Sequence, residues 1–297
     1  MSATRHNIRL LFLGLLTFVL LAANCWGARV VRDDLGRQVI LPDTPHRVVC
    51  LAPSITDTVY SLGAGDTVVA ITNFTKYPAA AETKPSVGGI TNPSIEVIIA
   101  LHPDLVFALG QLSPNDVARR LETLGVAIFF VLPRGIRGIY SSIESLGRAL
   151  NRTPAANELV ARLQRREMAV RARVAGQPVP RIFFPVWLEP VITAGRNAFI
   201  TELIAAAGGK SITDDLAQDW PQISLETVVA RQPEGLLLIR ESQLTIADLK
   251  TKAVWKDLKC VQQGKVFYVD DRINSPSPVA FDALEELANQ FHPQGSH

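Results

Sequence analysis

Two short segments, 130 residues apart, carry the same pairing of a serine with a glutamate. Ser94 is followed two positions later by Glu96, and Ser224 in the same way by Glu226. Serine is a good helix N-cap, so each pair is expected to open a helix with the glutamate in its first turn. The carboxylate could simply complement the helix dipole there. Alternatively, each could be an exposed anion that docks on arginines of a partner, because arginine binds carboxylate in bidentate fashion.

Aromatic residues are few, and several fall just after predicted strands or in loops. Phe74 and Tyr77 follow one apolar run, Trp187 follows another, and Trp220 lies in a loop rich in polar residues. Open α/β sheets bind ligands at the loops that follow their strands. Core packing is the usual fate of any one aromatic, but the set fits a wide, flat, partly apolar ligand.

Catalytic patterns are missing from the sequence. It has no G-x-S-x-G, no Walker loop, no H-E-x-x-H and no C-x-x-C. Its five histidines have no spacing that would make a metal cage. We therefore expect no catalytic residues, no metal site and no bound cofactor. An enzyme on the same scaffold stays open as an alternative, and it would need a polar catalytic cluster.

The overall composition is that of an ordinary globular protein. Apolar residues make up 47% and charged residues 20%, and the formal charge is +2. The first 28 residues contain two basic and no acidic side chains, so the rest of the chain is balanced in charge. Such a chain lacks the basic surface that nucleic acid needs. We expect a monomer without a nucleic-acid partner.

The N-terminus is typical of an export signal over residues 1–28. Arg5 and Arg9 precede an apolar run at 10–23, which small residues follow. The run is shorter than a spanning helix needs. A retained membrane anchor and lipid attachment at Cys25 are the alternatives. No second apolar segment of spanning length follows, so the exported remainder is expected to be soluble and periplasmic or otherwise extracytoplasmic.

The other two cysteines could pair or stay free. A disulfide between Cys50 and Cys260 is chemically permitted outside the cytoplasm. We expect two buried thiols instead, because the two residues fall in different predicted lobes.

Apolar runs alternate with helical patterns in the first half of the chain. Strands are predicted at 47–51, 68–72, 105–109 and 126–132, with helices between them. Ser54 and Asp57 have the spacing of a helix-capping pair after the first strand. This rhythm favours a parallel sheet with helices on both faces. From about residue 139 to 175 the pattern is helical without strands, and its second helix is long enough for a rod of roughly 30 Å.

The alternation of strands and helices then begins again after residue 176, and part of it repeats the sequence of the first half. Residues 94–104 and 224–234 match in Ser, Glu, Ala and Pro at the same spacing, and each precedes a strand. The sequence thus predicts an α/β fold with two similar lobes that contain parallel sheets, joined by a long rigid helix. The bounds are 29–136 for the N-terminal lobe, 137–176 for the linking helices and 177–297 for the C-terminal lobe. A cleft between two lobes is a favoured small-molecule site.

Several segments in order resemble one known family. They are Asp33–Arg37, Arg47–Thr56, Asn92–Glu96, Pro103–Val106, Trp220–Ser224 and Gly264–Val269. Together they resemble the periplasmic solute-binding proteins for cobalamin and ferric chelates, with the vitamin B12-binding members nearest. The resemblance implies a domain over about 47–297, two lobes on a long helix, and a role as the binding component of an ABC importer. It implies the permease, and through it the ATPase, as partners.

The resemblance also assigns roles to single residues. It implies that Glu96 and Glu226 dock on arginines of the permease. It places Phe74, Trp220 and the stretch from Asp271 and Arg272 to Ser275 at the ligand. That stretch reads Asp-Trp-Phe-Glu-Arg in the B12-binding members, and only the leading acid is kept here. A corrinoid is therefore the leading ligand, with haem or a ferric siderophore as metal-chelate alternatives. A ligand-sensing receptor subunit is a further alternative role.

Overall fold

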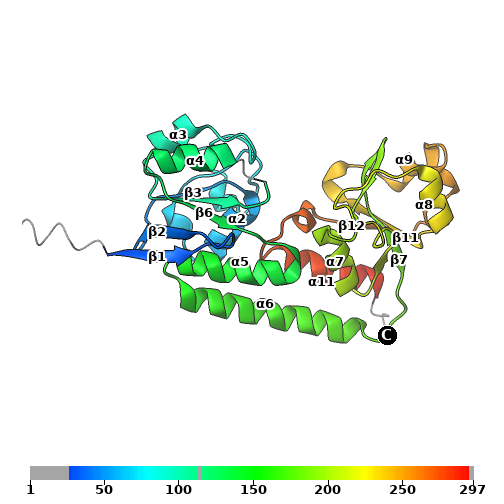
Figure 1. Cartoon of the computed structure of the whole chain (residues 1–297). Helices are drawn as coiled ribbons and strands as arrows, with labels where there is room; N and C mark the ends of the chain where they lie inside the picture. Colours follow the sequence, from blue (N-terminus) through cyan, green and yellow to red (C-terminus); the bar gives the residue numbers. More distant parts are fainter. Residues whose placement is uncertain (1–26, 113–114, 294–297) are drawn as a thin grey trace, which may run out of the picture.

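The computed structural model describes residues 27–112 and 115–293, which form two lobes above a layer of long helices (Figure 1). The N-terminal lobe holds a parallel four-stranded sheet in the order β4-β3-β5-β6. Its strands are β3 (Val48–Cys50), β4 (Val68–Ala70), β5 (Leu105–Leu109) and β6 (Ile128–Val131). Its helices are α2 (Pro53–Ser61), α3 (Ile95–Ala100) and α4 (Asn115–Thr123). All four predicted strands are confirmed, and every residue of β5 and β6 is buried, as expected for a sheet covered on both faces.

A two-stranded antiparallel hairpin, which was not predicted from the sequence, precedes this sheet. It consists of β1 (Ala28–Arg32) and β2 (Gln38–Pro42). The buried Asp33 carboxylate holds its turn, because it accepts hydrogen bonds from the backbone N–H groups of Leu35 and Arg37 at 3.0 and 2.9 Å. A second acid, Asp34, accepts a 2.9 Å hydrogen bond from the N–H of Leu132 and so fixes the hairpin to the end of β6.

The C-terminal lobe repeats the parallel arrangement, with the order β10-β7-β11-β12. Its strands are β7 (Arg181–Phe183), β10 (Lys210–Ser211), β11 (Gly235–Ile239) and β12 (Val266–Val269), with an antiparallel hairpin of β8 (Pro185–Leu188) and β9 (Val191–Thr193). Its helices are α7 (Phe199–Ala206), α8 (Leu225–Arg231), α9 (Ile246–Thr251) and α10 (Lys259–Gln262). The two parallel sheets confirm the predicted fold of two similar α/β lobes.

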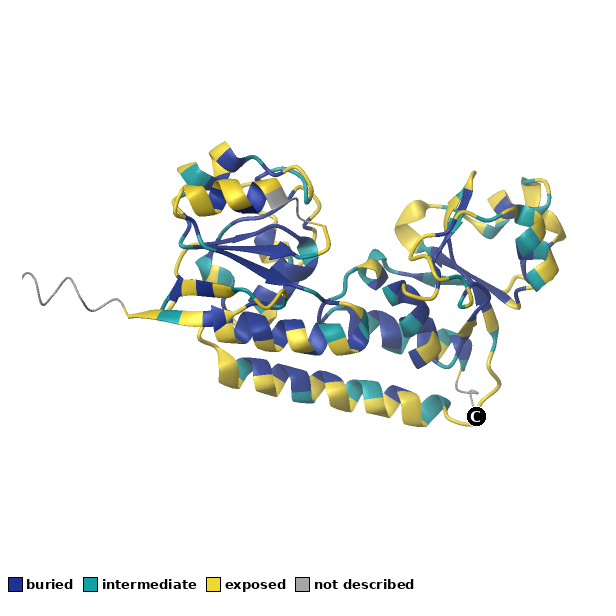
Figure 2. Cartoon of the chain, viewed as in Figure 1, coloured by how far each residue is buried: buried dark blue, intermediate teal, exposed yellow. Residues whose placement is uncertain are grey.

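Three helices join the lobes. They are α5 (Gly135–Ala149), α6 (Thr153–Val174) and α11 (Ala280–Phe291). The 22 residues of α6 span roughly 33 Å at about 1.5 Å a residue, so the predicted rod is present. Its Arg166 donates to Glu285 and to Asp282 of α11, both at 2.7 Å. Figure 2 shows that the buried residues of α6 face the other two helices while its outer side is exposed.

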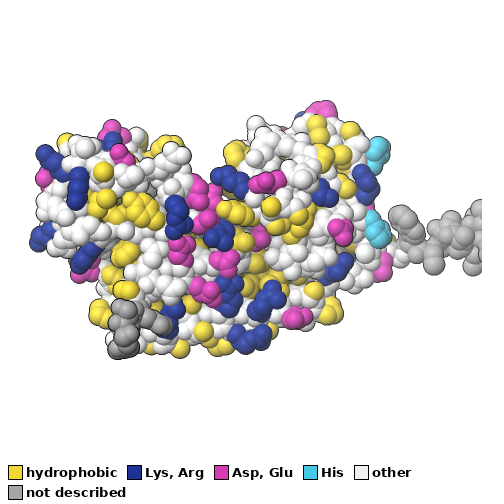
Figure 3. All heavy atoms as spheres, turned by 180° about the vertical axis from the view of Figure 1, so that it is seen from behind, with side chains coloured by type: hydrophobic (Ala, Val, Ile, Leu, Met, Phe, Trp, Pro, Cys, Tyr) yellow, Lys and Arg dark blue, Asp and Glu magenta, His cyan; other side chains and the backbone are white. Residues whose placement is uncertain are grey.

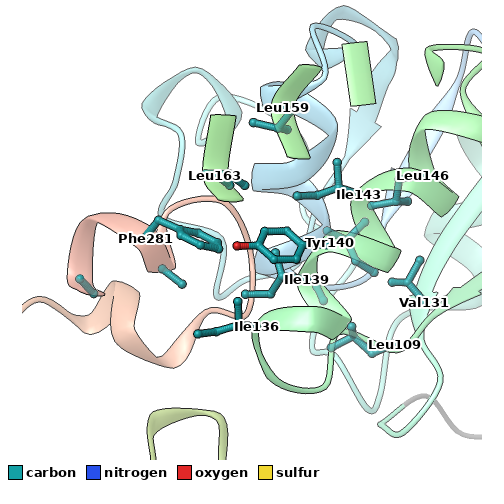
Figure 4. Packing of buried hydrophobic residues seen from close by; sticks show 14 of the residues in the cluster. Leu109, Val131, Ile136, Ile139, Tyr140, Ile143, Leu146, Leu159, Leu163 and Phe281 are labelled. Carbon is teal, nitrogen blue, oxygen red and sulfur yellow. The ribbon is translucent and has the colours of Figure 1, made fainter. Parts of the chain in front are cut away.

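The lobes share one hydrophobic core through this layer. One cluster of buried residues runs from the N-terminal sheet through α5 and α6 to α7 and α11. At its centre the ring of Tyr140 on α5 stacks on Phe281 of α11, with ring centroids 5.6 Å apart (Figure 4). Leu159 and Leu163 of α6 belong to the same cluster and lie on one side of this ring pair (Figure 4). The linking helices are therefore part of the core of both lobes.

The two cysteines in the described part of the chain, Cys50 and Cys260, are free and buried, which confirms the expected thiols. Burial raises the pKa of the Cys50 thiol to about 12. Residues 1–26, which hold nearly all of the predicted export signal and Cys25, lie outside the described residues. Within the described residues, no helix combines the length and the apolar character that a membrane crossing requires.

Candidate functional site

A cavity of about 900 Å³ lies between the two lobes. Figure 3 shows the notch above it, with basic and acidic side chains gathered near its floor. Loops that follow β3, β4, β5 and β6 line one wall, and loops that follow β9, β10 and β12 line the other. The cavity thus lies where open α/β sheets bind ligands, beyond the ends of their strands.

Three of the four aromatic residues singled out from the sequence line this cavity. They are Phe74 and Tyr77 on the N-terminal lobe and Trp220 on the C-terminal lobe. Phe74 and Trp220 are 62% and 51% exposed, so both leave much apolar surface open to a ligand. Trp187 is also exposed, at 64%, but it lies on β8 and does not line the cavity. The position of Trp187 after an apolar run suggested a strand-end loop, whereas that stretch continues as the β8–β9 hairpin.

Asp271 and Arg272 also line the cavity, where they contact the opposite lobe. Asp271 accepts a hydrogen bond from Lys76 at 3.0 Å across the cleft, and this bond raises the pKa of Lys76. Arg272 pairs with Asp270 at 2.8 Å, and its guanidinium lies 5.8 Å from the centre of the Tyr77 ring. These contacts form a polar bridge between the lobes at the cavity.

Charged residues that the sequence did not single out complete the walls. Arg134 follows β6 and Arg196 follows β9, and both line the cavity. The guanidinium of Arg196 is held by hydrogen bonds to the carbonyl groups of Asp214 and Asp215, both at 3.0 Å. Glu202 accepts a 2.9 Å hydrogen bond from the N–H of Ile136 at the start of α5. Their positions after strands were the only signal in the sequence that could have placed them at the cavity. That signal is weak, because charged residues are common in loops.

The predicted capping pair at the start of α2 is wrong. Ala52 is the N-cap, no side chain caps the helix, and Pro53 takes its first position. Ser54 and Asp57 lie inside the helix and both line the cavity. Burial raises the pKa of Asp57, and hydrogen bonds from Ser277 and from the N–H of Val279 oppose that rise. The spacing of Ser54 and Asp57 thus places both side chains on one face of α2 and does not mark a cap.

One group of acids in the described residues has a geometry that could hold a cation. Carboxylate oxygens of Glu241, Asp270 and Asp271 lie within 4.8 Å of one another. Lys76 and Arg272 already form ion pairs with Asp271 and Asp270. The acids therefore serve the bridge between the lobes, and we assign no metal site to them.

The paired serines and glutamates open two helices, as expected. Ser94 accepts from the N–H of Val97 at 3.3 Å and Ser224 from that of Thr227 at 3.2 Å. Glu96 and Glu226 lie exposed in the first turns of α3 and α8, one on each lobe. A backbone hydrogen bond in that turn, followed by the serine hydroxyl, lowers the pKa of each carboxyl. Both side chains are therefore anions at neutral pH.

The sequence model of a protein family described as periplasmic binding protein matches residues 48–273. The chain belongs to this family. The match covers most of both lobes together with α5 and α6, and it includes most of the residues that line the cavity.

Individual members of the periplasmic binding protein family are similar over most of the chain. A vitamin B12-binding protein of Vibrio parahaemolyticus is 30% identical over 249 residues, which are 83% of this chain and 89% of the relative. The solved structure of a periplasmic vitamin B12-binding protein of Vibrio cholerae has a TM-score of 0.73 at 26% identity and covers 83% of this chain and 96% of that one. A periplasmic haem-binding protein from Roseiflexus sp. RS-1 has a TM-score of 0.76 at 25% identity, covering 83% and 97%. These relatives are named for what they bind, and the resemblance inferred from the sequence is confirmed.

Proposed function

We propose that this periplasmic binding protein captures a corrinoid in the cavity between its lobes and delivers it to the permease of an ABC importer. The observation that carries the proposal is the cavity itself, where Phe74, Tyr77 and Trp220 face a space of about 900 Å³. Cavities of this size hold a whole small molecule, and aromatic faces on both walls suit a broad, flat one. The B12-binding relatives support a corrinoid as that ligand.

Titration of the purified mature protein with cyanocobalamin tests the ligand. Intrinsic tryptophan fluorescence should fall saturably, because Trp220 lies on the cavity wall. Haem and a ferric siderophore serve as competing ligands in parallel titrations. Tight binding of one of these without any response to cyanocobalamin would refute the corrinoid assignment.

Haem is the second candidate, and one observation favours it. Tyr77 lines the cavity, and a tyrosine oxygen can ligate haem iron. Among the described residues no histidine or methionine lines the cavity, which leaves Tyr77 as the natural axial ligand. If haem is the ligand, Tyr77→Phe should shift the Soret band of the complex, whereas the same change should leave a cobalamin spectrum unaltered.

Docking on the permease is assigned to Glu96 and Glu226. Both are exposed, ionised and placed once on each lobe, so they offer two separated carboxylates to arginines of a partner. The double variant Glu96→Ala with Glu226→Ala should abolish uptake in cells and leave ligand affinity intact. Glu82→Ala with Glu189→Ala, which also removes one exposed glutamate from each lobe, is the matched control. Normal uptake by the first double variant would sink the docking assignment.

Export is expected to remove residues 1–28 and to leave a soluble periplasmic monomer. Intact-mass measurement of the protein from the periplasmic fraction determines the new N-terminus. A mass that matches a chain beginning at an acylated Cys25 would show that the protein is lipid-anchored and is not cleaved after residue 28.

A further inference from the structure

The N-terminus of α2 opens directly onto the cavity. Ala52, Pro53 and Ser54 line it, and no side chain caps the helix. Proline has no N–H, so the first free donors are the N–H groups of Ser54 and Ile55. Within residues 27–112 and 115–293 neither of these has a hydrogen-bond partner. The nine-residue helix therefore presents unpaired donors and the positive end of its dipole to the ligand space.

The Ser54 hydroxyl adds a side-chain donor at the same place. Ser54 as a whole is only 5% exposed, and it lines the cavity. No hydrogen bond joins its Oγ to another group of the described residues, and this atom is not among the fully enclosed ones, so it is open to the cavity. An oxygen acceptor on a bound ligand would satisfy the hydroxyl and the helix N–H groups together.

Asp57 supplies the complementary group one turn further along α2. Residues three apart lie on the same face of a helix, and Asp57 also lines the cavity while it is 6% exposed. Its carboxyl accepts from Ser277 and, at 3.2 Å, from the N–H of Val279. A carboxylate has about four acceptor sites, so Asp57 keeps capacity for a donor on the ligand.

We propose that Ser54 and Asp57 form a subsite for a primary carboxamide of the ligand, with the amide oxygen on Ser54 and the amide NH₂ on Asp57. The inference rests on the proposed function and sharpens it, because a corrin ring carries carboxamides around its edge. Haem carries carboxylates instead, and a carboxylate in this subsite would lie beside the Asp57 carboxylate unless one of the two took up a proton. Like charges brought together in a desolvated site disfavour the wrong ligand. The subsite thus selects a corrinoid over haem.

Calorimetric titration of the exported protein tests the subsite with cobalamin and with its monocarboxylic acids, in each of which one peripheral carboxamide is hydrolysed to a carboxylate. At least one of these acids should bind the wild type about tenfold more weakly or worse than cobalamin, because it leaves buried groups of the site unpaired. Asp57→Asn should reduce this difference in affinity between cobalamin and the acid, since the asparagine amide can donate a hydrogen bond to the carboxylate of the ligand. Ser54→Ala should raise the Kd for cobalamin by about fivefold to tenfold, as expected for one lost hydrogen bond in a buried site.

Ser61→Ala is the matched control, because Ser61 is an exposed serine at the other end of α2. If cobalamin binds and Ser54→Ala behaves like Ser61→Ala, the subsite is wrong while the corrinoid function stands. Equal affinity of the wild type for cobalamin and for all of the monocarboxylic acids would also overturn the subsite. This measurement uses only the wild type, so it does not depend on whether a variant folds. A wild type that binds no corrinoid overturns both the subsite and the proposed function.

Discussion

Replacement of Trp220 by alanine should weaken ligand binding by a predictable amount. Trp220 lies on the C-terminal wall of the cavity with 51% of its surface exposed. Aromatic side chains present about 150–250 Å², so roughly 100 Å² of this residue is open to a ligand. At about 25 cal/mol for each Å² buried, full coverage would contribute about 2.5 kcal/mol. A flat ligand that covers one face would bury about half, which is about 1.3 kcal/mol or roughly tenfold in Kd.

Trp187 provides the matched control for this variant. It is another exposed tryptophan of the C-terminal lobe, but it lies on β8 away from the cavity. Isothermal titration with cyanocobalamin should give a Kd about tenfold weaker for Trp220→Ala and an unchanged Kd for Trp187→Ala. Far-UV circular dichroism and the Tm of both variants confirm that each is folded.

Two results would refute this reasoning. An unchanged Kd for Trp220→Ala would mean that the ligand does not contact the C-terminal wall at this residue. A loss in Trp187→Ala equal to that in Trp220→Ala would mean that the ligand site extends to the β8–β9 hairpin, outside the cavity that the structure shows.

Further predictions concern the layer of helices and the buried thiols. The hydrogen bond from Arg166 lowers the pKa of Glu285 from its usual 4.5, so the stability of this pair is complete above pH 4.5 and is lost as the pH falls through the lower folded pKa. Arg166→Met should therefore flatten the fall of Tm between about pH 5 and about pH 3. Phe281→Ala should lower the unfolding free energy by about 3–5 kcal/mol in urea denaturation, because its ring is fully buried. In Ellman titrations, Cys50 and Cys260 should react only after unfolding, because burial raises the pKa of both thiols.

Sequence patterns predicted the parts of the fold that depend on regular repetition. The alternation of apolar runs with helical segments gave both parallel sheets, and the matched Ser-x-Glu pairs gave two capped helices at the right residues. These features are local, because a strand or a cap needs only its neighbours in the chain. The turn of the β1–β2 hairpin is held locally by Asp33, but the contact that fixes the hairpin to the lobe, that of Asp34 with the end of β6, joins residues far apart in the chain and has no local signal.

The site was predictable only in part, for a similar reason. Phe74, Tyr77, Trp220, Asp271 and Arg272 were placed at the ligand by residue type, loop position and resemblance, and the structure brings all of them to one cavity. Trp187 met the criteria of residue type and position after a strand, and yet it does not line the cavity. Which wall a loop residue faces depends on how two lobes are set against each other, and no local pattern encodes that.

The shared core of the two lobes has a consequence for how the molecule loses its structure. Because one apolar cluster joins the N-terminal sheet to α7 and α11 through α5 and α6, unfolding of either lobe also exposes apolar surface of the other. Unfolding should thus be cooperative over the whole chain, with one calorimetric transition in place of two. A ligand bound between the lobes would raise the temperature of that single transition by an amount that grows with the logarithm of its concentration relative to Kd. Thermal shift can therefore serve as a quantitative screen for the natural solute across a panel of tetrapyrroles and iron chelates.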